Sequence, residues 1–402
     1  MLNADSTFTA DVTLTNDAHW VLNGRTAVGN DNVDPATLWI EQGTTIIGQR
    51  GEDFLVVRRG SKVQALGTAA APIVMTSIQD VTGEETDIGQ WGGLVVLGRA
   101  PANSCGDQVG DTTEDELANC GVAAEGDAGQ FGGNVADDNS GTINYVVVKH
   151  AGRTLGNGDE LNGITLAGVG SGTAIDYIQV HKNLDDGLEF FGGTVSVKHV
   201  VLTANGDDSL DWSFGWTGNI QYVLIKQDEA AGDNGIEADN SEFDAAARPL
   251  TNPTVANLTV IGDNTNNGVR LRAGTAGSLY NVLVTGPENF ANCLRVNGAE
   301  SEALATDGTL SMQSSVIACS EANNFGTDFS RDWFTGEASN RVVAPDGLGL
   351  ATNGYQPAAG SVLLEGATDV QEINSFFDSV DFVGAVGEEN DWTEGWVTVG
   401  LE

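Results

Sequence analysis

The sequence between Asn162 and Val296 repeats one phrase six times: Asn162-Gly-Ile-Thr, Asp186-Gly-Leu-Glu, Asp208-Ser-Leu-Asp, Asn234-Gly-Ile-Glu, Asn267-Gly-Val-Arg and Asn292-Cys-Leu-Arg. Successive copies begin 24, 22, 26, 33 and 25 residues apart. Recurrence at this spacing is typical of a solenoid, in which each unit buries its apolar face against its neighbours. The repeat therefore predicts an elongated coil of stacked turns.

A second phrase lies within each period and fixes the type of secondary structure. It reads Ile143-Asn-Tyr-Val-Val-Val, Ile175-Asp-Tyr-Ile-Gln-Val, Val197-Lys-His-Val-Val-Leu, Ile220-Gln-Tyr-Val-Leu-Ile, Val255-Ala-Asn-Leu-Thr-Val and Leu279-Tyr-Asn-Val-Leu-Val. Both phrases alternate apolar and polar residues, which is the period of a strand. Gly and Asn at the phrase starts are expected at bends that need positive φ. Short strands joined by such bends predict an all-β parallel β-helix.

Alternation also assigns the faces of the first phrase. The residues expected to point inward are Leu188, Phe190, Leu210, Trp212, Ile236, Ala238, Val269, Leu271, Leu294 and Val296. The residues between them, expected to point outward, are Glu189, Asp211, Glu237, Arg270 and Arg295.

The rest of the chain divides around this repeat. Residues 1–80 contain short apolar runs between Gly-rich bends, and we expect them to form an N-terminal cap and the first turns. Residues 81–320 form the main β-helix, interrupted by a long polar excursion at 100–140, a length often linked to function. Residues 321–402 form loops and capping turns of the same domain, in which Phe376–Val399 is expected to close the C-terminal end.

Several segments resemble one family. They are Leu38-Trp-Ile-Glu-Gln-Gly-Thr-Thr-Ile, Trp91-Gly-Gly-Leu-Val-Val-Leu-Gly, Leu161-Asn-Gly-Ile-Thr-Leu-Ala-Gly-Val-Gly-Ser-Gly-Thr, Asp185-Asp-Gly-Leu-Glu-Phe-Phe-Gly-Gly-Thr-Val and Asp391-Trp-Thr-Glu-Gly-Trp. The chain is similar along nearly its whole length to pectate-lyase-like β-helix proteins that marine and other Gram-negative bacteria export or anchor to lipid. The resemblance implies a right-handed coil and a secreted or cell-surface location, and it leaves the activity open.

The cysteines point to an oxidising compartment. Cys105 and Cys120 bracket part of the polar excursion, and a bridge between them would contribute about 3 kcal/mol. Cys293 and Cys319 lie about one period apart, so they either bridge adjacent turns or stay as buried thiols. We expect an extracytoplasmic protein. No signal peptide or membrane-length apolar run is present, as in a mature exported domain.

Charge restricts the partners. The chain has 57 acidic and 17 basic residues and a formal net charge of −40. Such a field repels nucleic acid and anionic lipid, so we expect neither as a partner. It suits a divalent cation, a saline medium, or both, and the simplest alternative is an acidic surface that keeps the protein soluble.

Stacking the phrases aligns acidic residues in columns, and these form the candidate metal site. The predicted ligands are Asp185, Asp186, Glu189, Asp207, Asp208, Asp211, Asp233 and Glu237. Neighbouring strands are about 4.8 Å apart, and two carboxylates at that distance repel by roughly 3–4 kcal/mol at an effective dielectric near 20. Oxygen ligands in this number favour Ca²⁺ over zinc or copper. The alternative is an acidic face exposed to water. Asn30–Asp34 is a weaker ion candidate, with a simple turn as its alternative.

The same outward column continues with arginines, which raises an enzymatic alternative. Arg270 and Arg295 follow the acids, and a calcium-dependent polysaccharide lyase would use one of them as the base. A glycoside hydrolase could use two of the carboxylates, such as Glu189 and Asp211. The non-enzymatic alternative is that arginine pairs with the acidic column, for example Arg270 with Glu237.

Aromatic residues beside the acidic columns suggest a role in binding. Most are expected in the core, but Phe191 and Trp216 are candidates to face outward and stack against sugar rings. We therefore favour a calcium-binding surface protein with a structural, adhesive or glycan-binding role over an enzyme. Its partners would be polysaccharide or copies of itself.

Overall fold

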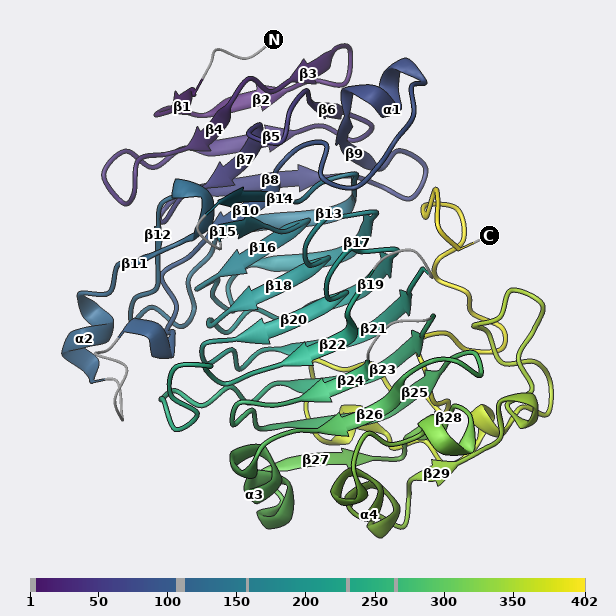
Figure 1. The fold of residues 1–402 in the computed structure, drawn as a ribbon. Coiled ribbons are helices and arrows are strands. Elements are labelled where there is room, and N and C mark those ends of the chain that lie inside the picture. Colours follow the sequence, from purple (N-terminus) through teal and green to yellow (C-terminus); the bar gives the residue numbers. More distant parts are fainter. Residues whose placement is uncertain (1–4, 106–112, 157–158, 229–231, 264–266, 402) are drawn as a thin grey trace.

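The computed structural model describes residues 5–105, 113–156, 159–228, 232–263 and 267–401. Over these residues the chain winds in stacked turns, and the strands of successive turns pair into two large parallel sheets (Figure 1). The sheets enclose one continuous apolar core. The prediction of an all-β parallel β-helix is confirmed.

Sheet 1 consists of β1 (Thr7–Phe8), β4 (Arg25–Val28), β7 (Phe54–Val57), β10 (Gly93–Leu97), β16 (Ile164–Ala167), β18 (Leu188–Phe191), β20 (Leu210–Ser213), β22 (Asn234–Ala238), β24 (Asn267–Leu271) and β26 (Asn292–Val296). Sheet 2 consists of β2 (Val12–Leu14), β3 (His19–Val21), β5 (Thr37–Ile40), β6 (Thr45–Gly48), β8 (Lys62–Leu66), β9 (Ile73–Ser77), β13 (Gly141–Lys149), β17 (Ala174–His181), β19 (Val197–Thr203), β21 (Asn219–Lys226), β23 (Thr254–Ile261), β25 (Gly277–Thr285), β27 (Leu310–Gln313), β28 (Val316–Ala318) and β29 (Arg341–Val342). The strands of the repeat therefore alternate between the two sheets.

The long strands of sheet 2 bend at a left-handed residue, which gives the coil a third side. β8 and β9 pair with the first and second halves of β13, on either side of Tyr145 (φ 48°). The same bend recurs in the following turns at Tyr177, His199 and Tyr222, which have φ of 53°, 49° and 64°. Positive φ is uncommon for residues other than glycine, so this corner was not expected from the sequence.

Sheet 1 has the register that the repeat predicts. Leu188 pairs with Leu210, and Phe190 with Trp212. Every residue expected to point inward along β18 to β26 is at most 1% exposed and belongs to the core cluster. The inward assignments are confirmed.

The glycines of the first phrase serve a purpose that differs from the expected one. None of the phrase starts has positive φ among the described residues, so the expectation of left-handed bends there is wrong. Instead, a Cβ on Gly187 would lie 2.6 Å from the Ser209 carbonyl oxygen of the next turn. A Cβ on Gly235 would lie equally close to the Gly268 carbonyl oxygen. Glycine is needed because adjacent turns approach closely here.

The excursion predicted at 100–140 covers the outer face of sheet 1. Residues 106–112 lie outside the described part. The remainder includes α2 (Glu114–Ala118) and the hairpin of β11 (Val122–Ala123) and β12 (Gln130–Phe131). Ala128 and Phe131 pack against outward residues of β7 and β10. A second hairpin, β14 (Arg153–Gly156) with β15 (Asp159–Leu161), lies beside it.

Two disulfides are present, one within the excursion and one between β26 and the residue that follows β28. Cys105 is bonded to Cys120, with Cα atoms 5.1 Å apart, and Cys293 to Cys319, with Cα atoms 6.2 Å apart. Both predicted pairs are therefore confirmed, and the alternative of buried free thiols is not.

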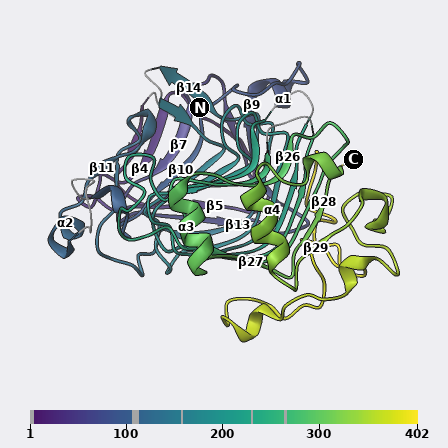
Figure 2. The same cartoon turned by 60° about the horizontal axis from the view of Figure 1, so that its bottom comes forward.

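The C-terminal end of the coil is closed by helices. α3 (Ala299–Asp307) and α4 (Asp328–Gly336) lie across it (Figure 2), and Ala305 and Phe334 enter the core. α1 (Ile78–Thr82) follows β9. Short 3₁₀ turns lie at Asn103–Cys105, Glu125–Asp127, Glu321–Asn323, Pro345–Gly347, Val362–Leu364 and Val370–Glu372. No helix of the described part has the length and apolar character required to cross a bilayer.

Residues 361–401, here called the C-terminal segment, run back along the outside of sheet 2. The side-chain amide of Asn281 on β25 bonds to Thr368 O at 2.9 Å. Asn257 on β23 bonds to Phe382 O at 3.0 Å, and Gln179 on β17 to Val399 O at 2.7 Å. Trp396 packs edge-on against Tyr145 and Tyr177. The expectation that Phe376–Val399 closes the end of the coil is thus replaced by contacts along its side.

Candidate metal centre

The outward column of sheet 1 changes from acidic to basic along the coil. The strand register places Thr165, Glu189, Asp211, Glu237, Arg270 and Arg295 on six consecutive strands. Each side chain therefore lies about 4.8 Å from the next strand's equivalent. The three acids occupy the middle of the column and are neighbours in space.

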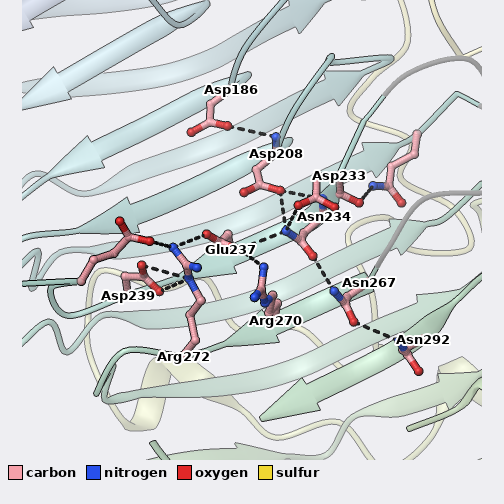
Figure 3. A network of polar contacts seen from close by, with 12 residues as sticks. Asp186, Asp208, Asp233, Asn234, Glu237, Asp239, Asn267, Arg270, Arg272 and Asn292 are labelled. Atoms are coloured by element: carbon pink, nitrogen blue, oxygen red, sulfur yellow. Dashed lines mark hydrogen bonds and ion pairs between the residues drawn. The ribbon is translucent and has the colours of Figure 1, made fainter. Parts of the chain in front are cut away.

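A ladder of amides and carboxylates runs beside this column at the strand starts (Figure 3). Asp186 Oδ1 accepts a hydrogen bond from Asp208 N at 2.9 Å, and Asp208 Oδ1 accepts from Asn234 N at 2.6 Å and from Asn234 Nδ2 at 2.8 Å. Asn234 Oδ1 in turn accepts from Asn267 Nδ2 at 2.7 Å. Each turn thus uses one side-chain oxygen to hold the next turn in register.

Two positions of this ladder are aspartates, Asp186 and Asp208, and their carboxylates lie close to those of the outward column. Oxygen atoms of Asp186, Glu189 and Asp211 lie within 4.8 Å of one another, and so do those of Asp208, Asp211 and Glu237. Asp211 belongs to both groups. The three other predicted ligands, which are Asp185, Asp207 and Asp233, join Asp186 and Asp208 in two further groups of the same kind. The structure therefore brings together all eight residues.

Four of these eight carboxyl groups are buried, and three, among them Asp211, are half-buried. Asp208 is 4% exposed, Asp186 7%, Glu237 8% and Glu189 9%, whereas Asp207 remains exposed. A simple acidic face in contact with water is thus wrong for the inner residues. The excursion and the loop at 241–247 stand over Asp186 and Glu189, because Glu125, Glu242 and Phe243 line one pocket with these two acids.

Burial and mutual repulsion disfavour the charged form of these groups. Loss of hydration, followed by repulsion from other carboxylates, raises the pKa values of Asp186, Glu189, Asp208 and Asp211 well above the ordinary range. The same causes raise the pKa of Asp185 to about 8. Oδ1 of Asp211 is buried without a hydrogen-bond partner in the described structure.

Arginines neutralise only one end of the cluster. Arg270 Nη1 lies 2.9 Å from Glu237 Oε1, so the predicted pairing is present. Arg272 Nη2 lies 2.7 Å from Glu237 Oε2, and its Nε lies 2.9 Å from Asp239 Oδ1. Burial nevertheless raises the pKa of Glu237 to about 7 against the opposing effect of both arginines. No described lysine, arginine or histidine forms an ion pair with Asp186, Glu189, Asp208 or Asp211.

The pocket above the cluster contains acids that sequence reasoning missed. Its volume is about 290 Å³, and Glu125, Glu160, Asp239 and Glu242 help to line it. Repulsion from Glu160 and Glu125 contributes to the raised pKa of Asp185. Asp239 and Glu242 follow the fourth copy of the phrase, where they meet Arg272. Glu125 and Glu160 come from the hairpins, whose paths the repeat does not determine.

The predicted outward aromatics have different positions. Trp216 is fully buried, and its ring stacks on Phe190 with centroids 3.9 Å apart, so the outward assignment is wrong. The chain turns at Gly215 (φ 87°), which breaks the alternation that carried the assignment. Phe191 does lie on the outer face, where it contacts Phe131 and Phe214.

The second ion candidate, Asn30–Asp34, forms a turn. Asn30 and Asp34 pair in an isolated bridge, and Asp31 and Asn32 have positive φ. Asp31 Oδ1 lies 2.6 Å from Arg59 Nε. The charge of Asp31 is therefore satisfied by arginine, and the turn alternative describes the loop.

Comparison with known proteins places this chain in a family. No curated protein sequence matches it. Among solved structures, the crystal structure of the Dettilon tailspike protein matches with a TM-score of 0.28 and 10% identity, over 95% of this chain and 60% of the tailspike chain. The chain thus spans less than two thirds of that protein. The family model of the pectate-lyase-like β-helix domain matches residues 6–353, which is most of the sequence. This chain therefore belongs to the pectate-lyase-like β-helix family.

Proposed function

We propose that this protein is a calcium-binding β-helix protein that acts outside the cytoplasm in a structural, adhesive or glycan-binding role. The observation that carries the proposal is that two clusters of three carboxylates share Asp211. Most of these carboxylates are buried, and most of them lack a basic partner. Burying several carboxylates without a counter-charge is strongly unfavourable. A bound cation would remove this cost.

The chemistry of the donors favours calcium among biological cations. Every member of these groups is Asp or Glu, and no histidine or cysteine of the described chain joins them. Hard oxygen ligands in a flexible arrangement suit Ca²⁺, whereas zinc and copper prefer nitrogen and sulfur. Asp186, Glu189 and Asp211 would hold one ion, and Asp208, Asp211 and Glu237 a second.

The location and the role rest on other observations. Two disulfides favour an oxidising compartment, and the β-helix family supports a role at a surface that meets glycans. In a structural role, calcium would bridge copies of the protein into an assembly. Self-assembly on addition of calcium, followed by light scattering, would favour that version over glycan binding.

A calcium-dependent polysaccharide lyase is the second candidate. Arg270 is a poor base because it pairs with Glu237. Arg295 stands next in the column, and its Nε is buried without a hydrogen-bond partner in the described structure. Ultraviolet absorbance of unsaturated sugars released from polyuronates, abolished by Arg295→Ala, would establish the lyase. Absence of this signal in saturating calcium would exclude it.

Thermal unfolding tests the calcium site directly. A ligand that binds only the folded state stabilises it by about 2.7 kcal/mol at a concentration of 100 times its Kd. We expect the Tm of the protein to rise in CaCl₂ and to fall in excess EDTA, with MgCl₂ giving a smaller effect. An equal Tm in calcium and EDTA at pH 8 would refute the proposal.

A further inference from the structure

An apolar cavity of about 210 Å³ adjoins the acidic pocket on the outer face of sheet 1. Its lining includes Glu125, Phe131, Leu161, Phe191, Phe214 and Phe243. Glu125, Phe191, Phe214 and Phe243 line both spaces, so the two form one continuous site with an apolar part and an acidic part. Neither the calcium proposal nor the family assignment accounts for the apolar part.

Phenylalanine rings form a row across the junction. The ring centroids of Phe131 and Phe191 are 6.2 Å apart, those of Phe191 and Phe214 5.8 Å, and those of Phe214 and Phe243 6.4 Å. Phe243, at the end of the row, is 71% exposed. The excursion supplies Phe131 and the loop at 241–247 supplies Phe243, while Phe191 ends β18 and Phe214 follows β20, so four separate segments of the chain build the row. Apolar cavities with a few converging polar groups are typical of small-molecule sites.

The charge of the acidic part selects the ligand. Nine carboxyl groups and one guanidinium, that of Arg272, line the acidic pocket. Two calcium ions would bring four positive charges against this formal excess of eight, and two ligands of the second ion, Asp208 and Glu237, are further acids outside the pocket lining. The faces of aromatic rings also attract cations, an effect that strengthens when water is excluded. Electrostatic complementarity thus disfavours an anionic ligand and favours a positively charged one.

We propose that this site binds an organic cation with an apolar body, namely an alkyl or aryl amine. The apolar body fills the cavity between Phe131, Leu161 and Phe191. The ammonium group lies at the junction, where it faces Glu125 and the acidic pocket and contacts the face of Phe243. This binding does not require calcium, because the positive charge of the ligand is attracted by the same carboxylates.

Isothermal titration with n-hexylamine in EDTA at pH 8 tests the proposal, with ethylamine, n-hexanol and hexanoate as comparison ligands. We expect n-hexylamine to bind, and each methylene added from ethylamine to n-hexylamine to raise the affinity up to about fourfold, the factor for a fully buried methylene. We expect weaker binding of n-hexanol and none of hexanoate. Equal binding of ethylamine and n-hexylamine would mean simple ion exchange and would overturn the proposal, as would equal binding of n-hexanol.

Variants locate the ligand. Phe243→Ala and Glu125→Gln should each weaken n-hexylamine binding about tenfold, while Trp39→Ala, which removes an exposed aromatic side chain from sheet 2, should leave it unchanged. Unaltered affinity in both site variants would overturn the proposal. Binding of neutral sugars in place of amines would also overturn it. The effect of calcium on Tm, measured without amine, reports separately on the metal site.

Discussion

Replacing Asp211 by Asn perturbs the one carboxylate that both predicted calcium groups share. Without calcium, the charged Asp211 is repelled by Asp186 and Glu189 on one side and by Asp208 and Glu237 on the other. One such pair at 4.8 Å costs about 3.5 kcal/mol at an effective dielectric near 20. The folded protein can avoid this repulsion by protonating Asp211. At pH 8, protonating an aspartate with an ordinary unfolded pKa costs about 5–6 kcal/mol, so the destabilisation by Asp211 cannot exceed that value. Asp211→Asn should therefore stabilise the metal-free protein by about 3–5 kcal/mol at pH 8.

The pH dependence of this effect has a definite sign. Burial and neighbouring carboxylates raise the pKa of Asp211 well above its unfolded value. The folded state therefore holds more protons than the unfolded state, and stability is lost as pH rises above about 4 toward the folded pKa. At pH 4 Asp211 is largely neutral when folded, so Asp211→Asn should change little there.

Urea unfolding of the parent and of Asp211→Asn, in EDTA at pH 4 and 8 and in CaCl₂ at pH 8, measures these differences. In CaCl₂ the order should reverse, because the parent gains calcium and the variant lacks the shared ligand. Asp346→Asn, at an exposed carboxylate, is the matched control and should match the parent throughout. If Asp211→Asn were less stable than the parent in EDTA at pH 8, the reasoning from buried repulsion would be refuted.

Three further predictions address the surrounding structure. Arg272→Met should lower the free energy of unfolding by about 3 kcal/mol at pH 8. The loss should be smaller at pH 5, below the pKa of about 7 of its partner Glu237, and urea unfolding at both pH values measures the difference. Asn234→Ala removes the ladder hydrogen bond from Asn234 Nδ2 to Asp208 and the one from Asn267 Nδ2 to Asn234 Oδ1, and it should cost about 2 kcal/mol, seen as a lower urea midpoint with an unchanged slope. Trp396→Ala should speed hydrogen exchange of the C-terminal segment while sheet 1 keeps its protection, which mass spectrometry of peptides resolves.

The repeat was sufficient to predict the stacked carboxylates, because the spacing of the phrases equals one turn and the strand period places Glu189, Asp211 and Glu237 on one face. The pairing of Arg270 with Glu237 followed from the same register. The repeat could not predict what covers these residues. Glu125 reaches the site from the excursion, whose course depends on packing against several turns and not on a local pattern.

Local backbone geometry accounts for the other differences. Trp216 follows a glycine with positive φ, so counting by two along the strand gave it the wrong face. The left-handed corner at Tyr145 and Tyr177 has no glycine to mark it. It is stabilised from outside, where the two rings stack with centroids 4.3 Å apart and Trp396 packs against both.

The C-terminal segment also has a consequence for how this coil could evolve. Ordinary solenoids gain or lose units easily, since each unit contacts only its neighbours. Here Asn281, Asn257 and Gln179 bind one continuous length of chain from three different levels of the stack. Duplicating or deleting a unit between β17 and β25 would displace these anchor points by about 4.8 Å relative to their backbone partners. The contacts of the C-terminal segment therefore constrain the number of turns between β17 and β25.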